Sequence, residues 1–568
     1  MPQHSFRETA KAIADVEWGC QCHRLARLNA AVERRLLGGQ TDRPRQRHRH
    51  RSTTTTSKTK PSPTQTVAAG AATEVAGSHR GLAPFRVAGG AGGGGGDAVD
   101  DAARARAFAQ RLARKHEDAP VTAIAEAAWR GVPELMGAGD ALMALAPHVL
   151  ERFGGEGAGS VLSVLTFANA HAVDCGEAGL VLVDCGTAMT APIIFDLLRE
   201  ETSLPLHTAV YTHGHADHIA VQEMEWEAPY RVVAQENVVA RFDRYRKTAG
   251  YNTFINKRQF QIPDAFDYQF PGSREGDLRY PDVTYREYMR FEVGGEVFEL
   301  FAAKGETDDA TIVWMPRRRY CFCGDFFIWN APNAGNPQKV QRYPEEWVHA
   351  ARKIVDLRPV IVFPGHGPPI LGEQRVREAF TNQARLLQGI VTYAMDGINA
   401  GVPLARLMAN APLPKELLEL PYLRPRYDDP RWFVATLWRR YCGWYTFDIR
   451  HLLPVDAASV GVELARLVGG TRALAAHAEQ LVLSGGAERL GVALEIAELA
   501  AAAADVENGS GDDAAESHRI RARVLRALER RESTLMAKSL YRAAAIDSEK
   551  KVDNSGNGDG DDDSTSRL

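Results

Sequence analysis

Runs of β-branched and aromatic residues alternate with amphipathic stretches through the middle of the chain. The runs with the length of single strands are 161–167, 180–183, 206–212, 230–235, 311–315, 320–324 and 360–363. Gly294-Gly295 separates two further strand-like segments and predicts a two-residue hairpin. Apolar positions have helical spacing at 192–201 and 344–356. Strands mixed with helices in this way predict an α/β domain.

The rest of the pattern is helical. Before the α/β region, helices are expected at 103–112, 121–129 and 141–153. After residue 373, apolar stripes at helical spacing occupy 376–396, 402–408, 431–441, 457–468, 472–483 and 490–503. The last helices resemble helical hairpins, and we interpret their apolar faces as surfaces for packing and self-association rather than for ligand binding.

Composition narrows the class of protein. Of the 568 residues, 45% are hydrophobic and 25% are charged, which is the balance of a soluble globular protein. The formal net charge of −4 argues against a nucleic-acid binder and against a polybasic membrane binder. No uncharged apolar run is long enough to span a bilayer, so we expect no membrane span.

Cysteine usage and the two ends of the chain bear on its location. The seven cysteines are scattered, which excludes a disulfide-rich scaffold and favours a reducing compartment; Cys321 and Cys323 are interpreted as buried apolar residues. Residues 1–104 are basic and glycine-rich and are expected to be mostly disordered, as is the acidic tail 547–568. The basic segment is either a solvated tail of a cytoplasmic protein or a leader for an organelle.

The densest chemistry follows the strand-like run 206–212. The sequence reads His213-Gly214-His215-Ala216-Asp217-His218, which places four candidate metal ligands in six positions. An extended backbone puts His213 and His215 on one side, where both reach one ion, while Asp217 and His218 turn toward a second. Imidazole with carboxylate suits zinc, and iron or manganese bind the same set. The alternative, a histidine-rich surface loop, is disfavoured because matching residues occur downstream.

Three more candidate ligands, Glu306, Asp325 and His366, also stand just after strand-like runs. Singly, they have plain explanations as a loop acid, a helix N-cap and a packed turn residue. Jointly, they add the carboxylates and imidazole that two adjacent metal ions require. The neighbouring Asp308 and Asp309 are either hydrogen-bond acceptors for ligand imidazoles or solvated loop residues.

The motif His-x-His-x-Asp-His, the later Asp325 and a Pro-Gly-His near the domain end resemble the metallo-β-lactamase superfamily of hydrolases. Glu306 stands where most of that superfamily has histidine, and this departure resembles the alkyl sulfatase branch, although typical alkyl sulfatases have Glu in place of Asp325. Residues 420–425 and 438–445 resemble the alkyl sulfatase dimerisation domain. The resemblance covers roughly 105–546.

This resemblance implies an αββα sandwich over 105–372 and an all-α dimerisation and helical-hairpin domain over 373–546. It also implies two divalent metal ions, expected to be zinc. The implied ligands are His213, His215 and Glu306 for the first ion, Asp217, His218 and His366 for the second, and Asp325 between them. Asp217 and Asp325 are therefore the catalytic carboxylates, and a metal-bound hydroxide attacks the ester.

The charge of this site favours sulfate. Two ions bring four positive charges and the three carboxylates bring three negative ones, so one net positive charge remains. A monoanionic sulfate ester fits such a site better than a dianionic phosphate monoester does. We therefore expect an alkyl sulfate monoester, a small anionic ester, as the substrate.

Two segments supply candidate contacts to that substrate. The expected substrate-binding residues are Arg342, Lys339, Asn333, Tyr251 and Asn252. The first three lie in the segment that follows Asp325 and offer donors to sulfate oxygens, unless they only cap or solvate the next helix. The other two lie in 237–260, which resembles the helical insert that covers the active site in the family.

Three classes of function therefore compete. The first is a metal-dependent, alkyl-sulfatase-like hydrolase that forms a homodimer. The second is another hydrolase of the superfamily, acting on thioesters, lactones or phosphodiesters. The third is a non-catalytic helical interaction protein with a vestigial metal-binding domain. Sulfate release separates the first class from the others, and fold analogy alone does not.

Overall fold

The computed structural model describes residues 121–131, 149–506 and 511–556. The predictions for 1–104, for the helix at 103–112 and for residues after 556 lie outside the described residues. Helix α3 (Val121–Trp129) is present as predicted. Nowhere in the described ranges does a helix combine the length and the apolar character needed to cross a membrane.

Two mixed β-sheets form the centre of the first half. The seven-stranded sheet has the order β1 to β7: Val149–Phe153, Val161–Leu165, Ala170–Asp174, Leu180–Val183, Leu206–Val210, Arg231–Gln235 and Val283–Tyr285. The six-stranded sheet has the order β13, β12, β11, β10, β9, β8: Ile370–Leu371, Ile361–Pro364, Tyr320–Gly324, Ala310–Met315, Glu296–Ala303 and Tyr288–Val293. The β8–β9 hairpin turns at the predicted glycine pair, whose φ angles are +56° and +83°.

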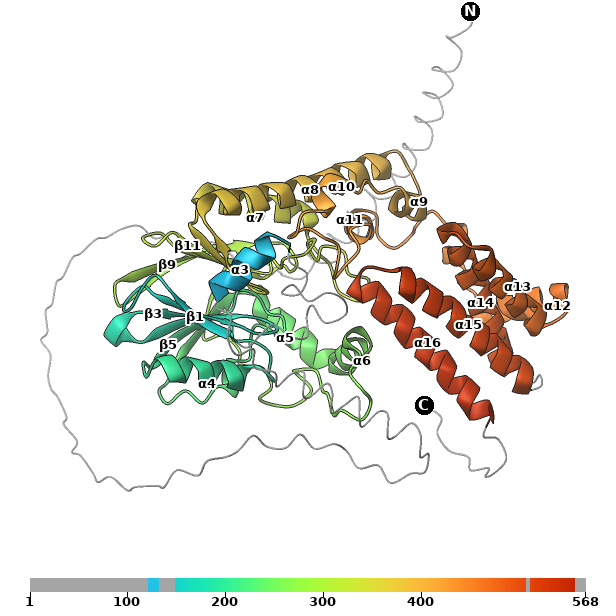
Figure 1. Cartoon of the computed structure of the whole chain (residues 1–568), viewed down its shortest axis with the longest axis horizontal. Helices are drawn as coiled ribbons and strands as arrows, with labels where there is room; N and C mark the ends of the chain where they lie inside the picture. Colours follow the sequence, from blue (N-terminus) through green and yellow to red (C-terminus); the bar gives the residue numbers. More distant parts are fainter. Residues whose placement is uncertain (1–120, 132–148, 507–510, 557–568) are drawn as a thin grey trace, which may run out of the picture. The chain divides into compact units, whose positions relative to one another are not determined.

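The sheets pack face to face and carry helices on their outer faces. Val181 and Val210 of the first sheet share one buried cluster with Phe298 and Val313 of the second. Helices α4 (Ala191–Glu201) and α5 (Asn237–Lys247) cover the first sheet, and α7 (Pro344–Leu357) and α8 (Glu373–Asn399) cover the second (Figure 1). Strands buried on both faces read as continuous apolar runs, which is why the sequence revealed them. The predicted αββα fold class is confirmed.

One predicted helix is wrong in its described part. The segment 141–153 was expected to be helical, but residues 149–153 form β1, which pairs antiparallel with β2. Pairing at the sheet edge outweighs the local spacing of apolar residues. Cys321 and Cys323, by contrast, are fully buried in the core as interpreted.

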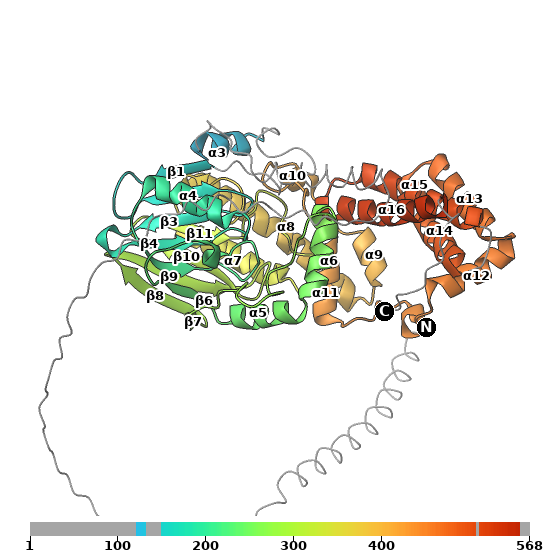
Figure 2. The ribbon, with the colours of Figure 1, turned by 90° about the horizontal axis from the view of Figure 1, so that it is seen from below.

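The second half is helical. After α6 (Ala249–Phe260) in the insert, the helices beyond α8 are α9 to α16: Leu404–Ala409, Lys415–Leu418, Trp432–Tyr441, Ala457–Val468, Thr471–Ser484, Ala487–Val506, Gly511–Arg531 and Leu535–Gly556. Short 3-10 turns occupy Gly176–Ala178, Val221–Glu223 and Ile449–Leu452. Buried alanines such as Ala475 and Ala497 let α13 and α14 approach closely. Helix α16 extends past the predicted boundary at 546 and lies beside α6 (Figure 2).

Strand direction places the ends of four strands together. Strands β9 and β11 each pair antiparallel with β10, so they run the same way, and β12 is parallel to β11. The carboxyl ends of β9, β11 and β12 therefore meet at one edge of the second sheet. The carboxyl end of β5 reaches the same place from the first sheet, because His213 contacts Asp325.

Candidate metal centre

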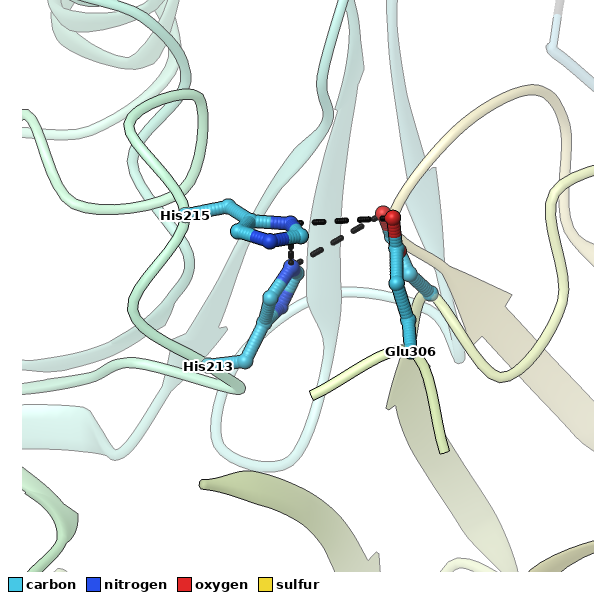
Figure 3. Close-up of side chains that lie close together, drawn as sticks. His213, His215 and Glu306 are labelled. Atoms are coloured by element: carbon cyan, nitrogen blue, oxygen red, sulfur yellow. Dashed lines mark hydrogen bonds and ion pairs between the residues drawn. The ribbon is translucent and has the colours of Figure 1, made fainter. Parts of the chain in front are cut away.

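Three candidate ligands meet beyond β5 and β9. His213 and His215 turn their rings toward the carboxylate of Glu306 (Figure 3). The Nε2 atom of His213 lies 2.9 Å from Nδ1 of His215, and this Nδ1 lies 3.8 Å from Oε1 of Glu306. Ligand atoms bound about 2 Å from one ion stand roughly 3–4 Å apart. The group therefore has the spacing of a single cation site.

Asp217, His218 and His366 form a second group. The Nε2 atoms of His218 and His366 lie 3.8 Å and 3.5 Å from Oδ2 of Asp217. Both histidines are buried, whereas Asp217 is 24% exposed. The ligand atoms of this group, like those of the first, all lie within 4.8 Å of one another.

Asp325 connects the two groups. Its Oδ2 atom lies 3.8 Å from Nε2 of His213 and 3.4 Å from Nε2 of His366, and its Oδ1 atom lies 3.4 Å from Nε2 of His218. One carboxylate thus reaches both groups. The structure brings together all seven residues that the sequence nominated as metal ligands.

Unpaired atoms in the centre fit divalent cations. Among the described residues, His218 Nε2, Glu306 Oε2 and Asp325 Oδ1 are buried without a hydrogen-bond partner. A buried polar atom left unpaired costs about 1–3 kcal/mol, so these atoms require a partner. Imidazole nitrogen and carboxylate oxygen are both ligands of zinc and similar ions. The residues present therefore fit a metal ion at each group.

The charges of the centre also call for cations. Burial raises the pKa of Glu306 well above its usual value, with Arg342 opposing the rise. Burial disfavours the charge on Asp325, but neighbouring histidines hold its pKa well below the usual range. Burial likewise disfavours protonated His218, yet Asp325 and other carboxylates raise its pKa to about 10. Cations bound in the centre would offset both the cost of burying Glu306 as an anion and the carboxylate charge that acts on His218.

Asp184, which directly follows β4, is a residue to which the sequence analysis gave no role. Its Oδ2 accepts hydrogen bonds from Nδ1 of His218 at 2.9 Å and from the Thr212 hydroxyl at 2.7 Å. With the proton fixed on Nδ1, the Nε2 lone pair of His218 is directed at the second group. The available signal was an aspartate immediately after a buried strand, as at Asp325.

We expect Asp184→Asn to lower the metal affinity of the second site by about 10- to 100-fold, because outer hydrogen bonds orient ligand imidazoles. Titration with a competing chelator measures the two binding events separately. Asp174→Asn is the matched control, since the Asp174 side chain accepts a hydrogen bond from the backbone N–H of Gly176 and is not one of the candidate ligands. Equal second-site affinity in both variants would contradict the role assigned to Asp184.

His366 is fixed by the connection between β2 and β3. Its Nδ1 donates to the carbonyl of Phe167 at 2.6 Å. The side chain of Asn169 donates to carbonyls on both sides of His366, those of Pro364 at 3.0 Å and Gly367 at 2.7 Å. The turn that presents His366 from the second sheet is thus held by the first sheet.

Asp308 and Asp309 pair with Arg241 of α5, not with ligand imidazoles. Arg241 donates to Oδ1 of Asp308 at 2.7 Å and also to the fully buried Asp309. The sequence left two alternatives open for Asp309, an acceptor for ligand imidazoles or a solvated loop residue, and the structure shows neither. Gly214 lies against this pair, because a Cβ there would stand 2.8 Å from Cδ of Arg241 and 2.9 Å from Oδ2 of Asp309. The ion pair therefore supports the loop between the two histidines.

A pocket of about 440 Å³ adjoins the centre. Five of the candidate ligands line it: His215, Asp217, Glu306, Asp325 and His366. Its apolar and aromatic lining comes from segments far apart in the chain: Phe167, Met189, Phe260, Ile262, Phe266, Tyr268, Ile328 and Leu535. The pocket therefore combines a ligand-rich floor with largely apolar walls.

All five residues predicted to bind substrate line this pocket. Two of them also contact Glu306. The guanidinium of Arg342 lies 3.1 Å from Oε1 of Glu306 and donates to its carbonyl, and Asn333 donates to the same Oε1. These contacts orient Glu306, so Arg342 and Asn333 serve the first ligand group whether or not they touch substrate.

The remaining three side chains differ in whether they already have a hydrogen-bond partner. Tyr251 donates to the carbonyl of Gln338, and Asn252 donates to the carbonyl of Thr248. The ammonium group of Lys339 makes no hydrogen bond or ion pair with any of the residues that the structure describes. Lys339 is therefore a cation available to a ligand.

Comparisons with known proteins match two segments of the chain to known families. Residues 164–366 match the metallo-beta-lactamase superfamily, and residues 405–551 match the alkyl sulfatase dimerisation family. The chain is 24% identical over 318 residues to a linear primary-alkylsulfatase of Pseudomonas sp., covering 51% of this chain and 59% of that protein. It is 21% identical over 327 residues to an alkyl/aryl-sulfatase of Saccharomyces cerevisiae, covering 53% and 51%. The chain thus spans about half or somewhat more of the length of these curated relatives.

A solved structure shares the fold. The inverting sec-alkylsulfatase Pisa1 from Pseudomonas sp. superposes with a TM-score of 0.63 at 18% identity, covering 80% of this chain and 78% of that one. The likeness extends beyond the sandwich into the helical half. The chain therefore carries a metallo-β-lactamase domain match over residues 164–366, followed by an alkyl sulfatase dimerisation match over residues 405–551, as the resemblance in the sequence predicted.

Proposed function

We propose that the chain is a hydrolase that uses two divalent metal ions, zinc by preference, to cleave sulfate monoesters of apolar alcohols. One observation carries the proposal: residues of two ligand groups joined by Asp325 line a pocket whose walls are largely apolar. The free ammonium of Lys339 in the same pocket supports an anionic substrate. The alkylsulfatase relatives support sulfate as that anion.

Metal ions bound there would supply an activated water molecule and would stabilise charge that develops on the sulfate group. The residues of the chain do the rest. Asp184 holds the proton of His218 away from the second ligand group, and Asp325 fixes the distance between the two groups. The Lys339 ammonium binds a sulfate oxygen, and the apolar walls receive the alcohol part and exclude water.

The net charge of the centre favours sulfate over phosphate. With two divalent ions bound, the carboxylates of Asp217, Glu306 and Asp325 leave one net positive charge. A neutral histidine in place of Glu306 would leave two, so this centre attracts a phosphate dianion less strongly than a centre with that histidine would. A sulfate monoester carries a single negative charge at neutral pH, which matches the single positive charge of the centre.

A substrate panel tests the proposal. Metal-replete protein is given alkyl sulfates, phosphate monoesters, phosphodiesters, thioesters and lactones, and product release is measured for each. We expect kcat/KM to be highest for a sulfate ester. Faster turnover of phosphate esters than of every sulfate ester, or hydrolysis of thioesters or lactones alone, would overturn the proposal in favour of another hydrolase.

Lys339 makes the proposal sensitive to pH. Burial, reinforced by Arg342, lowers the pKa of Lys339 to about 8. Its ammonium is charged below this pH and neutral above it, so KM for an alkyl sulfate is expected to rise as pH passes 8. Lys339→Met should raise KM at pH 7 by about tenfold and remove that dependence. Lys304→Met, which alters an exposed lysine outside the pocket, should keep the wild-type profile.

We also propose that the protein forms a homodimer through the segment 444–455. Trp444, Ile449 and Leu453 there are 71%, 69% and 79% exposed, and the segment lies within the match to the dimerisation family. Ile449→Asp combined with Leu453→Asp should halve the mass found by sedimentation. Tyr288→Asp, at an exposed position on β8, is the control, and a dimeric double variant would contradict this surface.

A further inference from the structure

Helix α5 presents one face to the pocket. Arg241, Arg244 and Tyr245 of this helix line it, at the spacing of three or four residues from Arg241 that places side chains on one side of a helix, and so does Thr248, the residue that ends the helix. The face thus brings two arginines into a pocket that is otherwise largely apolar.

The two arginines differ in charge compensation. Arg241 is buried and bonded to Asp308 and Asp309, so its charge is neutralised. Arg244 is partly buried, and its guanidinium lies over the Tyr245 ring, 5.2 Å from the centroid, but among the described residues it makes no ion pair or hydrogen bond. Burial lowers the pKa of Arg244, which shows that its charge is partly removed from water without full compensation. A guanidinium in this state is ready to bind an anion.

Arg244 and Lys339 serve different parts of the pocket. The charges that act on Lys339 are those of Arg342, Asp217 and Glu306, which belong to the floor, and that of the buried Asp428. The charged groups that act on Arg244 are Arg241, Asp308 and Asp309, all on or beside α5. Along the helix, Arg244 lies about 4.5 Å beyond Arg241, which itself rests on the loop of His213 and His215. Lys339 is therefore placed for the sulfate group, and Arg244 for a second group on the same substrate.

We infer that Arg244 is a specificity-determining residue that binds a carboxylate on the alcohol part of the substrate. The inference rests on the proposed function and narrows its substrates to sulfate monoesters of hydroxy acids with an apolar skeleton. A guanidinium presents paired donors that match a carboxylate, and it stays charged at any pH at which the protein is folded. The apolar walls receive the skeleton that joins the two anionic groups.

Matched substrates test the inference. One is the sulfate ester of an ω-hydroxy fatty acid, and the other is the same compound with its carboxylate masked as a methyl ester. The wild-type protein is expected to favour the free acid in kcat/KM by about ten- to a hundredfold. Arg244→Leu should abolish that preference by raising KM for the acid alone, with kcat unchanged. Arg246→Leu, an exposed arginine on the same helix outside the pocket, should behave as wild type.

Binding measurements separate this inference from the proposed function. Calorimetry with the corresponding pair of unreactive sulfonates requires no turnover. If neither sulfate ester is hydrolysed but binding still favours the acid in an Arg244-dependent way, the proposed function fails and the carboxylate site stands. Equal losses for both compounds in Arg244→Leu, or no loss for either, would overturn the inference.

Discussion

Asp325→Asn is expected to empty both metal sites at once and to abolish sulfate release. The carboxylate reaches His213 of one group and His218 and His366 of the other, at 3.4–3.8 Å. An amide has one oxygen and no negative charge, so neither group keeps its full set of ligands. The loss of activity should exceed the roughly 100-fold effect of removing an outer hydrogen-bond partner. Metal analysis together with a sulfate-release assay measures both effects.

His366→Ala is the comparison that tests whether both ligand groups share Asp325. His366 belongs to the second group alone, so this variant is expected to keep one metal ion per chain while Asp325→Asn keeps none. The thermal unfolding transition of each variant shows that the fold is intact. Two tightly bound ions in Asp325→Asn would show that the groups are independent, against the arrangement proposed.

Gly365→Ala is expected to disable the centre through a single methyl group. A Cβ at this position would stand 2.2 Å from Oδ1 of Asp325 and 2.9 Å from Cε1 of His218. Neither side chain can yield without leaving its ligand position, because His218 is held by Asp184. Activity should fall by about 100-fold or more, with weaker metal binding at both groups.

Gly389→Ala provides the control for that substitution. Gly389 lies in α8, where a Cβ would meet nothing within 4 Å, and alanine favours a helix. We expect wild-type metal content and activity, with equal or slightly higher stability. Wild-type activity in Gly365→Ala as well would mean that the centre tolerates a shift of Asp325, and the proposed bridging geometry would then be wrong.

Local patterns of apolar residues were enough to predict the strands that lie in the core. The strands β4, β10 and β11 are buried on both faces, so each appears in the sequence as a nearly continuous apolar run. The error at β1 has the opposite cause. Most residues of β1 are only partly buried, and the strand exists because it pairs with β2, a partner that no local pattern reveals.

The candidate ligands were found for a similar reason. Imidazole and carboxylate residues at the ends of buried strands are unusual enough to be noticed singly, and parallel strand direction brings such ends together. Their partners were harder to find. An aspartate such as Asp184, or the Arg241–Asp309 pair, looks like an ordinary polar or charged residue until its contact is known.

The sequence by itself therefore determined the α/β domain, the helical second half and the seven candidate metal ligands, because strand burial and ligand chemistry leave local patterns. The αββα arrangement was expected only from the resemblance to a known superfamily. Only the tertiary structure decided which residues hold those ligands in place and what surrounds them. Residues as far apart in the chain as Phe167 and Leu535 line the same pocket. Asn169, next to the first sheet, donates hydrogen bonds to the turn that carries His366 in the second sheet. Such contacts join segments far apart in the chain, and hydrophobic periodicity carries no information about them.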